Sequence, residues 1–122
     1  MKVLRIGIAS VDAMQARTRA ILSGKRKRKP DEPKLWFSSE QALFTVLSRE
    51  NRKVLDEIRR RPPASMTELA ERTGRKLSNL SRTLSTMANF GIVEFRRGAG
   101  RKKIPVVAYE RIDIVMPLEV AA

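Results

Sequence analysis

One side of a predicted helix, from about Lys76 to Asn89, carries short polar and basic residues. The apolar residues of this segment recur at helical spacing and are expected to face a core: Leu77, Leu80, Leu84, Met87 and Phe90. The opposite side carries hydroxyl, amide and cationic groups: Arg75, Lys76, Ser78, Asn79, Ser81 and Arg82. Such groups can bond phosphate oxygens and base edges. The pattern therefore predicts a helix suited to the major groove of DNA.

A shorter helix and a tight turn are predicted just before this helix. Ser65–Glu68 has the spacing of a capping box, in which the serine hydroxyl bonds the glutamate amide and the glutamate carboxylate reaches back. Gly74 ends the short helix, since glycine adopts the positive φ that a tight turn requires. The two segments together predict a helix-turn-helix.

A basic hairpin is predicted after the second helix. Ile92–Phe95 and Ile104–Tyr109 have the composition of two strands, and Pro105 favours an edge position or an interrupted ladder. The tip at residues 96–103 contains five cations, of which four are expected to contact DNA: Arg96, Arg97, Arg101 and Lys102. This order of elements predicts an α+β, mainly α, winged helix-turn-helix over residues 50 to 115.

The net charge indicates the kind of partner. The chain has 26 Lys and Arg against 13 Asp and Glu, a formal charge of +13 at pH 7. Cations that neutralise phosphates release condensed counterions, so such an excess is typical of proteins that bind a polyanion. An anionic membrane surface or an acidic protein is also compatible with the charge.

The chain contains no Cys and no His. Disulfides, thiolate–zinc sites and imidazole catalysis are therefore excluded, and no metal or cofactor is expected. No P-loop or dinucleotide-binding glycine pattern is present either, so a non-enzymatic protein is predicted. Apolar runs long enough for a membrane span or a signal peptide are lacking, which predicts a cytoplasmic protein.

The N-terminal part forms a separate segment in this interpretation. Residues 2–9 alternate like a strand, and Val11–Leu22 has the pattern of a helix. The predicted organisation is a strand–helix appendage at 1–24, a basic linker at 25–34, and the winged domain at 35–118. Within that domain, helices are also expected over Glu40–Leu47 and Arg49–Arg60.

The appendage is too small to fold alone, so its apolar side must be covered. Its own domain, a second copy of the chain, or a partner protein could cover it. The residues expected to bind a partner are Leu4, Ile6, Ile8, Met14 and Ile21. The cationic run at Lys25–Lys29 suits either a tether or a second DNA contact.

The segment from Ser65 to Met116 resembles the winged helix-turn-helix of MarR-like and ArsR-like bacterial repressors. The chain as a whole resembles a narrower family, the TumA-like antitoxins encoded beside a TumE-type toxin. The motifs are the capped "SMTELAERTGR" helix and the long helix ending in "NFGIVE". The resemblance implies a homodimer that represses its own promoter and neutralises a cognate toxin suspected to act on RNA.

Three other functions are compatible with the same residues. A stand-alone MarR-like or ArsR-like regulator would use the winged domain to bind DNA and would have no toxin partner. A basic RNA-binding protein would suit the charge, although aromatic residues, the usual stacking platforms for RNA bases, make up only 5% of the chain. A winged helix used only for protein contacts would not need a cationic hairpin.

Overall fold

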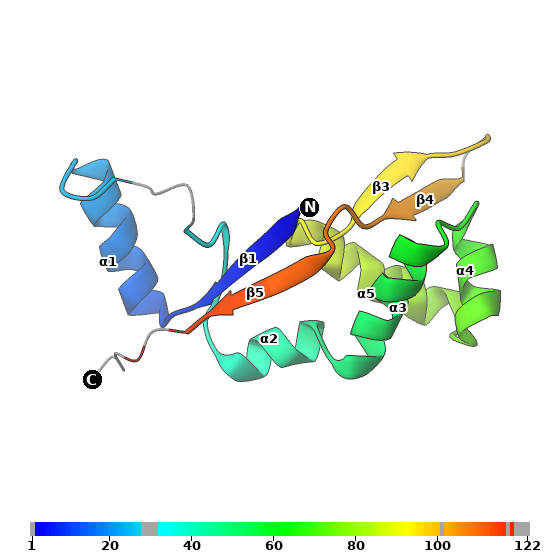
Figure 1. Ribbon diagram of the computed structural model, residues 1–122, viewed down its shortest axis with the longest axis horizontal. Coiled ribbons are helices and arrows are strands. Elements are labelled where there is room, and N and C mark those ends of the chain that lie inside the picture. Colours follow the sequence, from blue (N-terminus) through cyan, green and yellow to red (C-terminus); the bar gives the residue numbers. More distant parts are fainter. Residues whose placement is uncertain (1, 28–31, 101, 117, 119–122) are drawn as a thin grey trace. The chain divides into compact units, whose positions relative to one another are not determined.

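Serine caps and glycine turns divide the C-terminal two-thirds of the chain into short helices. The computed structural model describes residues 2–27, 32–100, 102–116 and 118 (Figure 1). Contacts divide the chain into two units. Of the described residues, the winged unit contains Lys2 and those of Val46–Glu110, and the sheet unit contains those of Val3–Thr45 and those from Arg111 onward.

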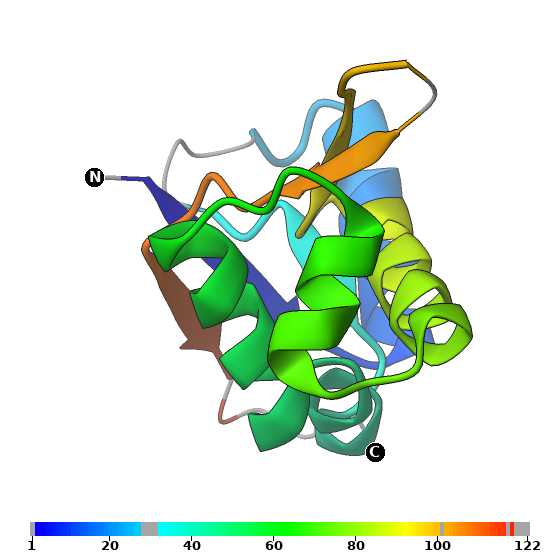
Figure 2. The same ribbon diagram turned by 90° about the vertical axis from the view of Figure 1, so that its right-hand side faces the viewer.

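The winged unit has the elements of a winged helix-turn-helix in the expected order. Helix α3 spans Arg49–Arg60, α4 spans Met66–Thr73 and α5 spans Leu77–Asn89. The antiparallel hairpin of β3 (Glu94–Arg97) and β4 (Lys103–Val106) follows. Figure 2 shows the three helices with this hairpin above them. The prediction of an α+β, mainly α, fold is confirmed.

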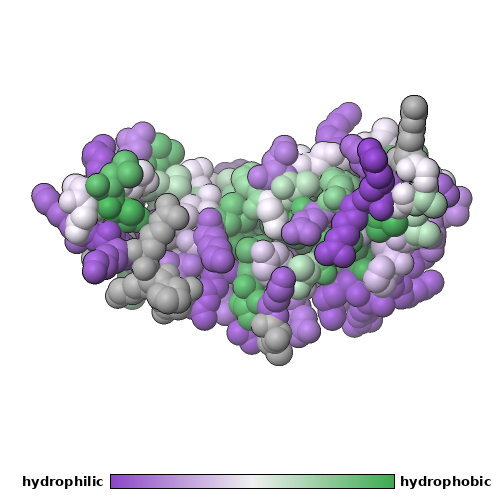
Figure 3. All heavy atoms as spheres, turned by 90° about the horizontal axis from the view of Figure 1, so that it is seen from above, coloured by the Kyte–Doolittle hydropathy of each residue, from purple (hydrophilic) through white to green (hydrophobic). Residues whose placement is uncertain are grey.

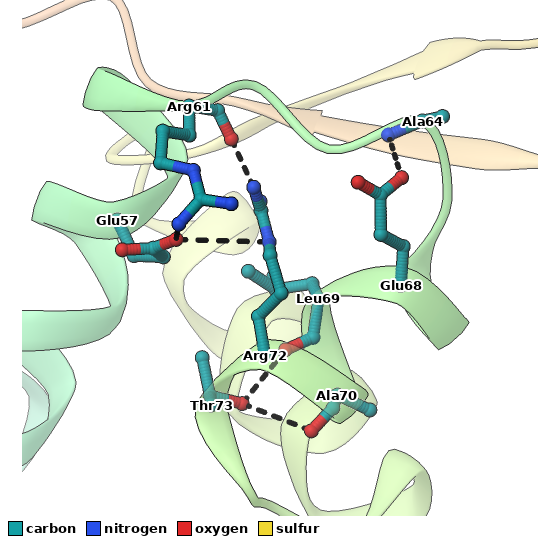
Figure 4. Close-up of polar contacts among 8 residues, drawn as sticks. All are labelled: Glu57, Arg61, Ala64, Glu68, Leu69, Ala70, Arg72 and Thr73. Carbon is teal, nitrogen blue, oxygen red and sulfur yellow. Dashed lines mark hydrogen bonds and ion pairs between the residues drawn. The ribbon is translucent and has the colours of Figure 1, made fainter.

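Local hydrogen bonds explain where these helices begin. The Ser48 hydroxyl accepts from the Asn51 amide at 3.2 Å, and the Ser65 hydroxyl accepts from the Glu68 amide at 3.1 Å. The Glu68 carboxylate reaches back as predicted, but it accepts from the Ala64 amide at 2.8 Å, one residue before the cap (Figure 4). Gly74 then ends α4 with a φ of 71°.

The core of the winged unit is lined by the apolar stripe of α5 and by residues of α3 and α4. Leu69, Leu80, Leu84 and Met87 have no exposed surface. Leu77 differs from the sequence prediction, because its side chain is 46% exposed. It is the first residue of α5.

The hairpin differs from the prediction at its edges. Ile92 and Val93 were predicted to lie in the first strand, but they are buried and precede β3. Pro105 lies opposite Phe95 in the β3–β4 ladder. In the described residues this sheet has only two strands, so proline, which lacks an amide hydrogen, occurs in an edge strand as expected.

The sheet unit contains three parallel strands in the order β2-β1-β5. These are β1 (Val3–Ile8), β2 (Leu35–Phe37) and β5 (Arg111–Val115), and the unit also holds helix α1 (Val11–Leu22) and most of α2 (Glu40–Val46). The boundaries predicted at residues 24 and 35 differ from this grouping, since β2 and β5 pair with β1 of the appendage. Alternation along the chain predicts a strand, but it does not identify the strand's partner.

The predicted linker at 25–34 lies partly outside the described residues. Of its described parts, Arg26 forms an ion pair of 3.3 Å with Glu32, and the Lys34 amide donates to the Arg5 carbonyl at 3.3 Å. Glu32 also pairs with Arg17 of α1. Desolvation raises the pKa of Glu32, but the hydrogen bonds from both arginines outweigh it, so the pKa is lowered overall.

Burial corrects part of the predicted partner-binding surface. Leu4, Ile6 and Ile8 of β1 are at most 8% exposed, so this chain covers them itself. Helix α1, by contrast, has no buried residue, and its Leu22 is 83% exposed. Figure 3 shows uncovered hydrophobic atoms over α1, at the left. Met14 and Ile21 are half-buried, and the prediction of partner binding remains for these two residues.

Gly7 lies so close to the Trp36 ring that its position has no room for a larger side chain. It lies opposite Trp36 in the β1–β2 ladder, and a Cβ atom on Gly7 would lie 2.4 Å from two ring carbons. Alanine normally favours a strand over glycine, yet we expect Gly7→Ala to lower the free energy of unfolding by about 1–3 kcal/mol through overpacking. Urea unfolding followed by the fluorescence of Trp36, the single tryptophan, measures this change. An unchanged or higher midpoint would show that the ring does not pack on Gly7.

Candidate nucleic-acid interface

Helix α5 presents a polar face on the side away from the core. The described side chains on this face are all exposed: Lys76 at the N-cap, then Ser78, Asn79, Ser81, Arg82 and Ser85. The stripe of Leu80, Leu84 and Met87 fixes this orientation, because three fully buried residues on one side leave the other side to solvent. Five of the six predicted helix contacts therefore lie on one accessible surface.

The sixth predicted contact, Arg75, has a different environment. Its guanidinium donates to the Asn51 side-chain oxygen at 3.0 Å, and the residue is only partly exposed. Asn51 in turn donates to the Val46 carbonyl at 2.9 Å. Arg75 therefore links the turn before α5 to the start of α3.

A second arginine from the cationic stretch holds α4 against α3. Arg72 donates to the Arg61 carbonyl at 2.7 Å, and its Nε atom lies 3.6 Å from the Glu57 carboxylate (Figure 4). Its side chain is only 16% exposed. This contact joins α4 to the end of α3, so Arg72 stabilises the packing of these two helices and is not itself part of the accessible face.

The hairpin carries exposed cations on both strands. Arg96, Arg97, Lys102 and Lys103 are exposed, and Arg101 lies outside the described residues. The turn is closed by the Gly98 amide, which donates to the Lys102 carbonyl at 2.8 Å. Figure 3 shows hydrophilic side chains over the right-hand part of the view, where the hairpin lies.

Lys103 is a residue of the hairpin that the predicted contact set omitted. Its Nζ atom lies 5.8 Å from the centre of the Phe95 ring, a cation–π distance. Lys102 and Lys103 also line an open pocket of about 370 Å³ with Ser65, Met66 and Thr67 at the start of α4. The hairpin thus lies beside the first turn of α4.

Acidic residues are distributed unequally over the winged unit. On α3, Asp56 pairs with Arg59 and Arg60 at 2.9 and 3.1 Å, and Glu57 pairs with Arg61 at 3.6 Å. On the hairpin, the described ion pair is that of Arg96 with Glu94, at 3.9 Å. Five cations of α5 and the hairpin have no ion pair within the described chain: Lys76, Arg82, Arg97, Lys102 and Lys103.

This distribution of ion pairs determines what kind of ligand the surface can attract. Three of the five cations of α3 pair with acids of their own helix, whereas those of α5 and most of those of the hairpin have no ion pair within the described chain. Such a surface attracts a polyanion. The described residues contain no group of three metal-ligating side chains, and no described helix is long and apolar enough to cross a membrane.

Comparison with known proteins gives a family match and a similarity to a solved structure. Residues 46–114, more than half of the chain, match the model of the HVO_A0114 family. No protein with a curated description matches the chain. One solved structure, described as a predicted DNA-binding transcriptional regulator from E. coli, has 20% sequence identity and a TM-score of 0.48. That similarity covers 83% of this chain and 86% of the other.

Proposed function

The chain belongs to the HVO_A0114 family, and we propose that it is a DNA-binding transcriptional regulator. The observation that supports this most strongly is the combination of an exposed polar face on α5 with a cationic hairpin. Both are parts of one winged helix-turn-helix, and both carry cations without ion pairs in the described chain.

In this proposal α5 enters the major groove with its polar face toward the bases. Asn79 can bond adenine and Arg82 can bond guanine, each through two hydrogen bonds. Lys76 lies at the N-cap of the helix, and Ser78 and Ser81 have short side chains. These three residues are suited to phosphate oxygens and nearby base edges. The hairpin cations would follow the sugar–phosphate backbone, where they supply affinity and no sequence preference.

We further propose that the chain acts in the cytoplasm as a homodimer and represses its own promoter. The resemblance to TumA-like antitoxins supports a second role, the neutralisation of a TumE-type toxin. The surface offered for a second copy or for the toxin is the part of α1 around Met14 and Ile21, because these residues are only half-buried and the predicted residues of β1 are buried.

The first experiment compares three ligands. The full chain is titrated in gel-shift assays with the duplex upstream of its own gene, a random duplex of equal length, and a structured RNA, at two salt concentrations. We expect preference for the upstream duplex that persists at the higher salt. Equal binding to all three would contradict sequence-specific regulation, and tighter binding to the RNA would favour an RNA-binding protein.

Two substitutions on α5 test the proposed base contacts. We expect Arg82→Ala and Asn79→Ala each to weaken binding to the upstream duplex by about 1–3 kcal/mol, because bidentate contacts to a base are lost. Binding to random duplex should change much less for Asn79→Ala, which removes no charge. Unchanged affinity of Arg82→Ala for the upstream duplex would place the wrong face of α5 in the groove.

A charge placed on α1 tests the partner surface. We expect Met14→Asp and Ile21→Asp to weaken dimerisation or toxin capture about tenfold or more, because an unpaired carboxylate would be buried at the interface. Light scattering reports the dimer, and co-purification with the neighbouring gene product reports capture. Ala16→Asp places the same charge on another, exposed side of α1 and should have little effect. If Met14→Asp and Ile21→Asp both still dimerise and still capture the toxin, this side of α1 is not the partner surface.

A further inference from the structure

Leu77 is an apolar side chain on an otherwise polar and cationic surface. It is 46% exposed, and no other large hydrophobic residue of the described winged unit is exposed to this extent. The remaining exposed large apolar residues lie in the sheet unit: Val11, Leu22, Phe44, Ile114, Val115, Met116 and Leu118. The exposure of Leu77 is therefore a specific feature of the proposed interface.

The position of Leu77 on the helix places it where bases are read. It is the first residue of α5, directly after Lys76 at the N-cap. Residues of the first turns of a recognition helix reach furthest toward base edges. Helical periodicity puts Ser81, four residues later, beside Leu77 on the exposed surface. Leu77 thus borders the polar face, while Leu80 and Leu84 fill the core.

Few groups in the major groove can pair with such a side chain. The base edges offer hydrogen-bond donors and acceptors, together with the C5 methyl group of thymine. We propose that Leu77 contacts a thymine methyl group and so adds specificity for an A·T pair. This inference rests on the proposed function of α5 as the recognition helix, and it adds a determinant that donors and acceptors alone would not provide.

The test removes the methyl group from the DNA and the leucine from the protein. The full chain first selects its preferred duplex from a randomised pool, and each thymine of that duplex is then replaced in turn by deoxyuridine. Burial of one methyl group corresponds to about a fourfold change in affinity. We expect one or two positions at which the replacement weakens binding about fourfold for the native chain and has almost no effect for Leu77→Ala.

Two variants control for other effects of the substitution. Leu77→Met keeps an apolar side chain and should keep the sensitivity to deoxyuridine. Phe44→Ala truncates an exposed apolar side chain at a helical position of the sheet unit and should leave the whole pattern unchanged.

The outcomes separate the inference from the proposed function. If the pool yields no preferred duplex, sequence-specific DNA binding itself is contradicted. If a preferred duplex is found but no thymine requires its methyl group, the inference about Leu77 is wrong and the proposed function stands. The inference is also wrong if Leu77→Ala and the native chain lose the same affinity at every sensitive position.

Discussion

Leu80→Ala is expected to lower the free energy of unfolding by about 2–5 kcal/mol, whereas Leu77→Ala should change it by less than about 0.5 kcal/mol. The two leucines are three residues apart on α5. Leu80 has no exposed surface, so its truncation leaves a cavity that the surrounding residues fill only partly. Leu77 is 46% exposed, and alanine is a strong helix former. Urea unfolding followed by far-ultraviolet circular dichroism compares the two variants.

The contrast between these variants tests the orientation of α5, on which the proposed interface depends. Trp36 fluorescence serves as the internal control, because Trp36 belongs to the sheet unit and the substitutions lie in the winged unit. Leu84→Ala, at a second fully buried position, should resemble Leu80→Ala. Equal losses for Leu77 and Leu80 would mean that the helix is rotated from the orientation described here, and Asn79 and Arg82 would then no longer be established as groove-facing.

Local signals allowed most of the winged unit to be predicted. Ser48 and Ser65 mark helix starts because each hydroxyl accepts a hydrogen bond from the backbone amide three residues later. This interaction is contained within one helical turn. Gly74 marks a helix end for an equally local reason, its positive φ. The spacing of Leu80, Leu84 and Met87 then gives the buried side of α5. Each of these features depends on residues close together in the chain.

Features that depend on distant residues were less predictable. The alternation of Ile112 and Ile114 indicates a strand, but β5 pairs in parallel with β1, more than a hundred residues earlier. Leu77 follows the apolar spacing of its helix, yet it is 46% exposed, although Leu80 in the same turn is fully buried. Periodicity identifies the side of a helix, and it does not show how far the covering residues extend.

Charge was informative about the interface as a whole but not about each arginine. Arg72, Arg75 and Arg82 all belong to one basic stretch of sequence, and only their contacts distinguish them. Arg72 bonds the Arg61 carbonyl, and Arg75 bonds Asn51. Arg82 has no ion pair among the described residues and is exposed. A guanidinium that stabilises the turn of the motif cannot be recognised from composition, because its acceptors lie 11 or 24 residues away.

The topology also changes how the N-terminal segment can be tested. Deleting the segment 2–22 would remove β1, the central strand of the sheet, and leave β2 and β5 without their partner. Loss of dimerisation after such a deletion would then report unfolding of the sheet unit as readily as loss of an interface. Single charges on α1 avoid this ambiguity, since that helix has no buried residue.

Removing three hairpin cations is expected to have the largest effect on DNA binding. In a variant with Arg96, Arg97 and Lys102 all replaced by Gln, three phosphate contacts are lost. The plot of log affinity against log salt should then become less steep by about 2.7, and binding to every duplex should weaken about 500-fold at 0.1 M salt. Lys103 is left unchanged because its contact with Phe95 contributes to the hairpin itself. Fluorescence anisotropy at four salt concentrations gives both quantities.

The matched control removes the same charge from a different surface. Lys53, Arg59 and Arg60 on α3 are exposed, and each pairs with an acid of its own helix. Replacing these three by Gln lowers the net charge equally but should alter the salt dependence only slightly, since long-range attraction between exposed charges is screened beyond about 10 Å at 0.1 M salt. If both triple variants flatten the plot to the same degree, DNA binding depends on total charge and the hairpin has no specific place on the backbone. A flatter plot for the hairpin variant alone, with the preference for the upstream duplex retained, would assign affinity to the hairpin and sequence recognition to α5.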